Sequence, residues 1–139
     1  MGLSLIHGTG LGLVQAADAD SATVQIHLGE QIYGQYCAIC HYDGAGNTAA
    51  PDLVGSSFWQ DGPRRTITLI LKGQSRVSVV DGKPFNGEMP AMDYLTDEEI
   101  AAVTAYVFTQ FAERKEGVEP ETVAELRTAL PKEGGKRVD

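Results

Sequence analysis

Two cysteines and a histidine stand together in the run C-A-I-C-H, which covers Cys37–His41. Residues three apart lie on one face of a helical turn, so the two thiols can reach one edge of a flat ring. At this spacing two thiols attach covalently to a haem, and the next side chain ligates its iron. The run therefore predicts one covalently attached haem c, with Cys37 and Cys40 as attachment points and His41 as the proximal iron ligand.

Two other chemistries use closely spaced cysteines, and the rest of the chain favours neither. A thioredoxin-like redox pair follows a strand in a βαβ unit, whereas residues 29–36 have a helical pattern and no parallel-sheet pattern follows. A structural zinc ion usually takes four Cys or His ligands, but the chain has no third cysteine and only His7 and His27 elsewhere. A chance run in a globular protein is the remaining alternative.

A second iron ligand is predicted in the segment 87–92, which has the sequence G-E-M-P-A-M. A thioether sulfur is a soft ligand that can occupy the iron position opposite a histidine. Met89 precedes a proline, whose ring stiffens the backbone and favours a positioned ligand over a flexible side chain. We therefore predict Met89 as the distal iron ligand, with Met92 as the competing candidate.

Helices and a hairpin are predicted to position these residues. The pattern from Gly29 to Tyr36 predicts the first helix, and Thr96–Glu99 (T-D-E-E) forms a capping box that starts the last core helix. Between them, Arg65–Lys72 predicts a short helix ending at Gly73. A small hairpin is expected around Asp81-Gly82, a dipeptide that favours a type I′ turn. The predicted buried stripe of the last helix comprises Ile100, Val103, Tyr106, Val107 and Phe111.

The glycine- and proline-containing segment Tyr42–Arg65 predicts a long loop, which a bound ring would organise. The carbonyl of Pro51 is a candidate acceptor for the free ring nitrogen of the histidine, with an ordinary loop proline as the alternative. The indole N–H of Trp59 and the guanidinium groups of Arg64 and Arg65 are candidate donors to haem propionates. Simple packing of the tryptophan and solvated arginines are the favoured alternatives.

Length and composition predict one small domain: 139 residues with a hydrophobic fraction of 42%. Residues 1–19 are expected to be an export signal or an N-terminal arm, because an apolar stretch leads to small-residue cleavage sites, although no Lys or Arg precedes it. Residues 20–113 are the predicted haem domain. Residues 114–139 are a predicted extension with a short helix after Glu119 and a disordered end. No stable membrane span is expected.

The formal net charge of −8 indicates an acidic surface. It argues against binding nucleic acid or an anionic lipid surface through a basic patch, and it permits electrostatic steering toward a basic partner. The alternative is an acidic surface that serves only solvation.

Taken together, these residues resemble the class I (mono-haem) c-type cytochromes, the cytochrome c domain family, over about Gly29 to Phe111. The resemblance implies an all-α fold in which the first and last helices cross near Gly29 around one haem c. It also implies iron ligation by His41 and Met89. The chain departs from the family at Tyr42, where glycine is usual, and in the hairpin Val77–Phe85 and the tail after Glu113.

The predicted function is one-electron transfer by a His/Met-ligated haem, and no acid, base or nucleophile constellation predicts an enzyme. The expected partners are a redox donor and acceptor, such as a periplasmic dehydrogenase or a terminal oxidase, and the expected location is periplasmic or otherwise exported. The chain is either a free carrier or the electron-transfer subunit of an oxidoreductase. A haem-based sensor with a labile sixth ligand is the alternative function.

Overall fold

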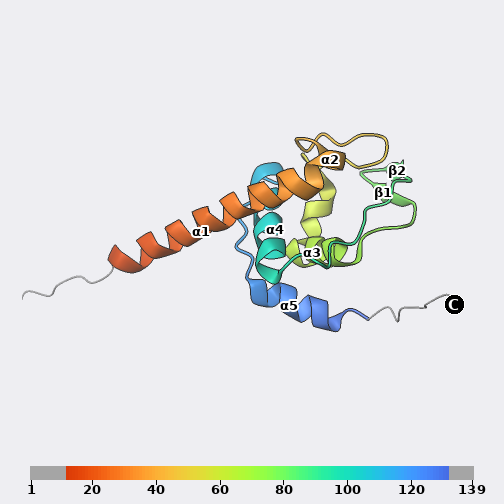
Figure 1. Cartoon of the computed structure of the whole chain (residues 1–139). Helices are drawn as coiled ribbons and strands as arrows, with labels where there is room; N and C mark the ends of the chain where they lie inside the picture. Colours follow the sequence, from red (N-terminus) through yellow and green to blue (C-terminus); the bar gives the residue numbers. More distant parts are fainter. Residues whose placement is uncertain (1–11, 132–139) are drawn as a thin grey trace, which may run out of the picture.

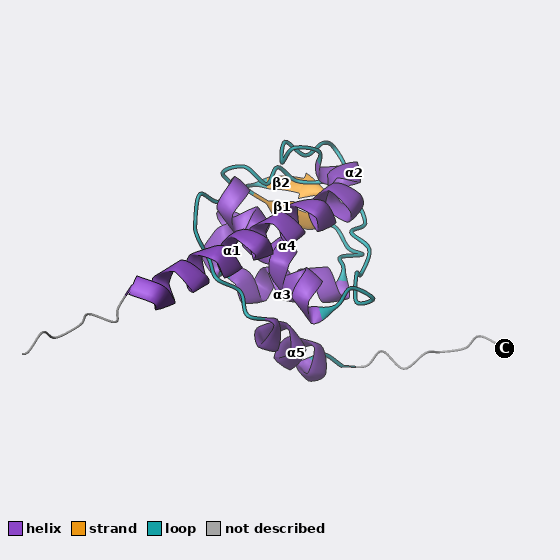
Figure 2. Ribbon diagram, turned by 60° about the vertical axis from the view of Figure 1, so that its left-hand side comes forward, coloured by secondary structure: helices purple, strands orange, loops and turns teal. Residues whose placement is uncertain are grey.

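The computed structural model of the chain describes residues 12–131, and its elements are predominantly helical (Figures 1 and 2). This agrees with the predicted all-α fold carrying a small hairpin. The elements in chain order are α1 (Gly12–Ile32), a π-helical turn (Tyr33–Cys37), α2 (Ala38–His41), a 3-10 turn (Ser57–Asp61), α3 (Pro63–Lys72), β1 (Ser78–Val80), β2 (Lys83–Phe85), α4 (Asp97–Phe111) and α5 (Pro120–Ala129).

The first helix is longer than predicted and ends differently. It begins at Gly12 rather than Gly29, and its early turns project away from the other elements (Figure 1). The α-helical pattern stops at Ile32, after which Tyr33–Cys37 forms a π-helical turn. The predicted export signal lies partly in the first turns of α1 and partly in residues 1–11, which are outside the described residues.

Helices α1 and α4 cross at Gly29, as predicted. A Cβ atom added there would lie 2.1 Å from the carbonyl oxygen of Ala102 and 2.7 Å from Cβ of Tyr106. Only glycine permits this approach of the two backbones. The Tyr33 ring packs beside the crossing, 5.5 Å from the Tyr106 ring between centroids. The residues of α4 nearest to Gly29 are therefore Ala102 and Tyr106.

Helix α4 begins with the predicted capping box, in which the Thr96 hydroxyl accepts from the Glu99 amide and the Glu99 carboxylate accepts from the Thr96 amide. The stripe predicted for it is largely buried, but burial extends beyond the stripe because α1, α3 and α5 all pack against this helix. Phe108, which the stripe did not include, is fully buried. Four of the stripe residues are buried, with Tyr106 half-buried, and Ala101, Ala102, Thr104 and Ala105 are buried as well.

Helix α3 starts at Pro63, two residues before the predicted start, and ends as expected at Gly73, which has φ of +66°. The hairpin that follows pairs Val79 with Pro84 in an antiparallel register. Its turn residues Asp81 and Gly82 have φ values of 51° and 76°, as a type I′ turn requires. The sequence therefore predicts both of these local features correctly.

Helix α5 is the short helix predicted after Glu119, and it packs against α3 and α4 (Figure 2). Val123 is fully buried, while Leu126 and Leu130 are partly buried against the same core. These apolar residues of the extension are thus part of the domain's core. The predicted disordered end falls largely on residues 132–139, which lie outside the described residues.

Candidate haem-binding site

His41 is the last residue of α2, and it is half-buried. Its Nδ1 atom is buried and has no hydrogen-bond partner among the described residues. Burial lowers the pKa of the imidazole, and the nearby carbonyl of Pro51 opposes this only in part. The ring is therefore held neutral, which is the form that binds a metal. Pro51 lies where the sequence suggested, but no full hydrogen bond to Nδ1 is formed.

The two cysteines lie one helical turn apart, Cys37 half-buried and Cys40 exposed. Burial, with a smaller contribution from Cys40, raises the pKa of the Cys37 thiol to about 11. No cluster of three or more His, Cys, Asp or Glu side chains suited to a metal occurs within residues 12–131. Two thiols one helical turn apart, followed by a histidine whose buried Nδ1 has no partner among the described residues, fit a covalently attached haem.

Asn47 organises the loop after His41, and the sequence reasoning missed it. Its side-chain amide donates to the carbonyl of Cys40 at 3.0 Å, while its Oδ1 accepts from the amides of Ala49 and Ala50 at 2.7 and 3.1 Å. Asparagine commonly closes turns of this kind, so the Gly46-Asn47 pair was a usable sequence signal. The residue fixes the path of the loop relative to the second cysteine.

Tyr42 occupies an unusual backbone conformation directly after the histidine, with φ of 47° and ψ of −127°. A non-glycine residue in this region carries strain of about 1–3 kcal/mol. The Tyr33 hydroxyl donates to the Tyr42 carbonyl at 3.0 Å and thereby holds the strained peptide in place. Tyr42 therefore stands at a position whose backbone conformation favours glycine, and the helical turn α2 still ends at His41.

Met89 lies in a segment fastened to the end of α3. Its amide donates to the carbonyl of Gln74 at 2.9 Å, and its carbonyl accepts from the Gln74 amide at 2.8 Å. A Cβ atom on Gly73 would lie 2.4 Å from the Met89 carbonyl oxygen, so glycine is needed for this approach. Met89 itself is half-buried, whereas the side chain of Met92 is 6% exposed and belongs to the core.

The two sides of the site meet at two contacts between segments far apart in sequence. A Cβ atom on Gly87 would lie 1.9 Å from the carbonyl oxygen of Ala49, so the segment leading to Met89 passes directly against the loop that follows His41. The rings of Tyr36 and Tyr94 pack edge to face, with centroids 5.9 Å apart. The fold therefore brings the segments of the two predicted iron ligands together.

The other candidate residues are engaged elsewhere. The Trp59 indole donates to the Leu53 carbonyl at 2.6 Å in the core, so it is a packing residue and not a propionate donor. Arg64 pairs with Glu125 of α5, and Arg65 pairs with Asp61. His27 is an exposed residue within α1, near Glu30.

Comparison with known proteins decides the family. Residues 24–107 match the family described as cytochrome c oxidase, cbb3-type, subunit III. Cytochrome c-552 of Thermus thermophilus is 36% identical over 110 residues, which cover 71% of this chain and 81% of that protein. The chain belongs to the class I mono-haem c-type cytochromes. The cytochrome accordingly carries one covalently bound haem c with its iron and acts as a one-electron carrier.

Two further relatives differ in length from the cytochrome. The chloroplastic cytochrome c6 of Chlamydomonas reinhardtii is 33% identical over 103 residues, and the chain spans 63% of its length. The fructose dehydrogenase cytochrome subunit of Gluconobacter japonicus is 33% identical over 118 residues, and the chain spans 23% of its length. Between residues 12 and 131, no helix of the cytochrome is both long and apolar enough to cross a membrane.

Proposed function

We propose that the cytochrome attaches its haem through Cys37 and Cys40, and ligates the iron with His41 and Met89. The observation that carries this assignment is the close approach of Gly87 to Ala49, which brings the Met89 segment against the loop that follows His41. A metal-binding role for His41 is supported by its buried Nδ1, which has no hydrogen-bond partner among the described residues, and by burial that lowers the pKa of the imidazole. Core burial of Met92 leaves Met89 as the better candidate for the second ligand.

Bound haem c supplies an iron that cycles between the ferrous and ferric states. The chain's own residues keep the coordination constant during that cycle. Thioether attachment at Cys37 and Cys40 would prevent loss of the ring, and burial lowers the pKa of His41 and so favours the neutral imidazole. A thioether opposite a histidine favours the reduced iron more than a second histidine does.

The ligand assignment is tested by visible spectroscopy of the holoprotein. Ferric iron bound to a thioether has a weak charge-transfer band in the far red. We expect Met89→Ala to abolish this band and Met92→Ala, the matched control, to retain it. The reverse result would assign the ligand to Met92. Retention of the band in both variants would refute the specific assignment to Met89. Its absence from the wild type would refute thioether ligation and favour the sensor alternative.

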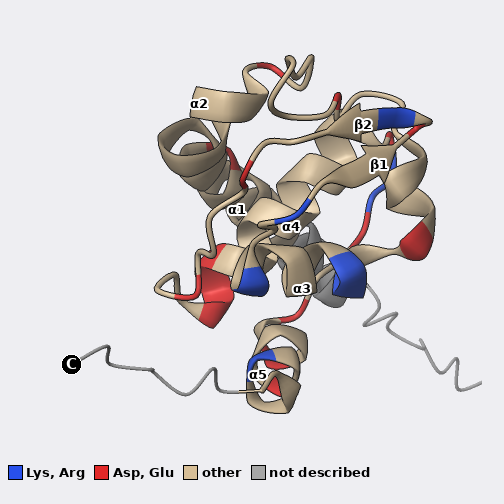
Figure 3. Ribbon diagram, turned by 90° about the vertical axis from the view of Figure 1, so that its right-hand side faces the viewer, with Lys and Arg blue, Asp and Glu red and all other residues tan. Residues whose placement is uncertain are grey.

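We further propose that the cytochrome is exported and exchanges electrons with periplasmic redox proteins, such as a dehydrogenase or a terminal oxidase. The relative that is a subunit of fructose dehydrogenase supports the first of these partners. Lys and Arg residues occur on α3 and at the hairpin (Figure 3), but Arg64, Arg65 and Lys83 are each paired with a carboxylate. The net charge of −8 therefore sets the sign of any long-range steering.

The partner proposal is tested by the rate at which a cationic redox protein reduces the ferric cytochrome over a salt series. Steering by opposite net charges weakens as salt screens it, so the rate should fall with ionic strength. A rate that is flat or rises with salt would exclude steering of a cationic partner by the acidic surface.

A further inference from the structure

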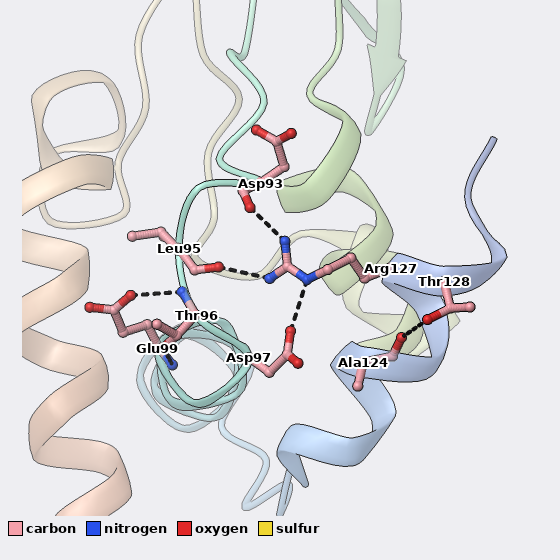
Figure 4. Close-up of polar contacts among 8 residues, drawn as sticks. All are labelled: Asp93, Leu95, Thr96, Asp97, Glu99, Ala124, Arg127 and Thr128. Atoms are coloured by element: carbon pink, nitrogen blue, oxygen red, sulfur yellow. Dashed lines mark hydrogen bonds and ion pairs between the residues drawn. The ribbon is translucent and has the colours of Figure 1, made fainter. Parts of the chain in front are cut away.

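Arg127 of α5 makes two hydrogen bonds to the segment that joins Met89 to α4 and a third to the first residue of α4 (Figure 4). Nη1 donates to the carbonyl of Asp93 at 2.5 Å, Nη2 to the carbonyl of Leu95 at 2.7 Å, and Nε to a carboxylate oxygen of Asp97 at 2.9 Å. The planar guanidinium is suited to such a set, because its donors point in fixed directions. The side chains of Arg127 and Asp97 are 33% and 30% exposed, so solvent competes only in part.

The segment from Met89 to Thr96 is also held by the buried side chains of Met92 and Leu95 and by backbone hydrogen bonds. The Met92 amide donates to the Ile70 carbonyl at 2.8 Å, and the Leu95 amide donates to the Met92 carbonyl at 3.1 Å. The pairing of Met89 with Gln74 fixes the first end of the segment. At the second end, next to the Thr96 capping box, the Arg127 contacts supply donors to the carbonyls of residues 93 and 95, which have no backbone amide partner within residues 12–131.

The position of Tyr94 connects these contacts to the haem-binding side. Tyr94 lies between the two carbonyls that Arg127 binds, and its ring packs against Tyr36, which directly precedes Cys37. Movement of the carbonyls at residues 93 and 95 would therefore displace a contact that joins the Met89 segment to the cysteine-bearing turn.

We propose that Arg127 is a positioning residue for the sixth iron ligand: by holding Asp93 and Leu95, it keeps the Met89–Thr96 segment in the arrangement that presents Met89. This inference rests on the proposed ligation of the iron by Met89. A weak thioether ligand needs such support more than an imidazole does, because the protein and not the bond determines how often it is released. The C-terminal extension is thereby a functional part of the haem domain.

The test measures binding of imidazole, which competes with a thioether for the sixth position, to the full-length ferric holoprotein. We expect Arg127→Ala to tighten imidazole binding by about fivefold or more, the effect of losing one or two net hydrogen bonds. Arg127→Lys keeps the charge without the planar donors and should be intermediate. The matched control is Arg64→Ala, which removes an exposed pair with Glu125 of the same helix and should leave the affinity near that of the wild type.

Amide hydrogen exchange of the same variants separates a local role from a general loss of stability. We expect Arg127→Ala to speed exchange in residues 89–96 while the amides at the α1–α4 crossing keep their protection. Unchanged imidazole affinity and loop exchange would overturn the proposal, as would a uniform rise in exchange across α1 and α4. Faster local exchange combined with a Met89→Ala variant that keeps the sulfur band would refute the ligand assignment and still support the contact of Arg127 with the segment.

Discussion

The proximal and distal sides of the haem site are held by different kinds of structure. Cys37, Cys40 and His41 lie on consecutive helical turns, and a few local hydrogen bonds from Asn47 shape the loop beyond them. Met89 has no helix or strand of its own, and its segment is held by contacts from α3 and α5. The amount of backbone support on each side matches the expected strength of the bond to haem on that side. Covalent attachment needs little further support, whereas a weak thioether ligand needs a fixed backbone.

The largest expected effect is on the proximal side. Cys37→Ala and Cys40→Ala should each remove one thioether bond and lower the haem content of the purified protein, and the double variant should hold no covalent haem. Haem staining of denatured protein on a gel and the intact mass measure this. Removal of all haem from the wild type by acid-acetone extraction would show that no covalent bond exists on this side.

The next effect is on the distal side, at the contact between α3 and the Met89 segment. Gly73→Ala should lower the free energy of unfolding by roughly 2–4 kcal/mol, because it combines backbone strain at positive φ with a clash against the Met89 carbonyl. Denaturant unfolding of the holoprotein measures this loss. Gly82→Ala is the matched control, since Gly82 also has positive φ but no atom lies within 4 Å of its added Cβ. Equal losses of unfolding free energy in the two variants would show that the contact between Gly73 and the Met89 carbonyl contributes nothing to stability.

The smallest expected effect is a gain in stability on the proximal side. Tyr42→Gly should relieve strain at φ of 47° and raise the free energy of unfolding by about 1 kcal/mol, after the entropy that glycine loses on folding is deducted. Tyr42→Ala removes the half-exposed ring but keeps the strain, and should give no gain. If Tyr42→Gly gives no gain either, the contacts of the Tyr42 ring stabilise the fold by at least as much as the backbone strain destabilises it. The loop on the proximal side would then depend on more than the local hydrogen bonds from Asn47.

Features that depend on nearby residues could be predicted from the sequence. The haem attachment run occupies five consecutive positions, and the capping box at Thr96, the glycine end of α3 and the type I′ turn at Asp81-Gly82 each span about four. The hydrogen bonds and backbone angles involved connect residues within one turn, so residue type and order decide them. The crossing at Gly29 was predicted from the pattern of the first helix together with the resemblance to the family.

Other features depended on which segments the fold brings together. Burial of α4 beyond its predicted stripe depended on packing by α1, α3 and α5 together, and on the contact between the rings of Phe108 and Trp59. The contact between Gly87 and Ala49 and the contacts of Arg127 with Asp93 and Leu95 join positions more than 30 residues apart.

By itself the sequence determined the chemistry of haem attachment, because that chemistry depends on the types and order of neighbouring residues. Only the tertiary structure decided how the second ligand's segment is held. Its backbone carbonyls have the same character at every position, and nothing in the residue types alone shows that a guanidinium from the C-terminal extension reaches two of them.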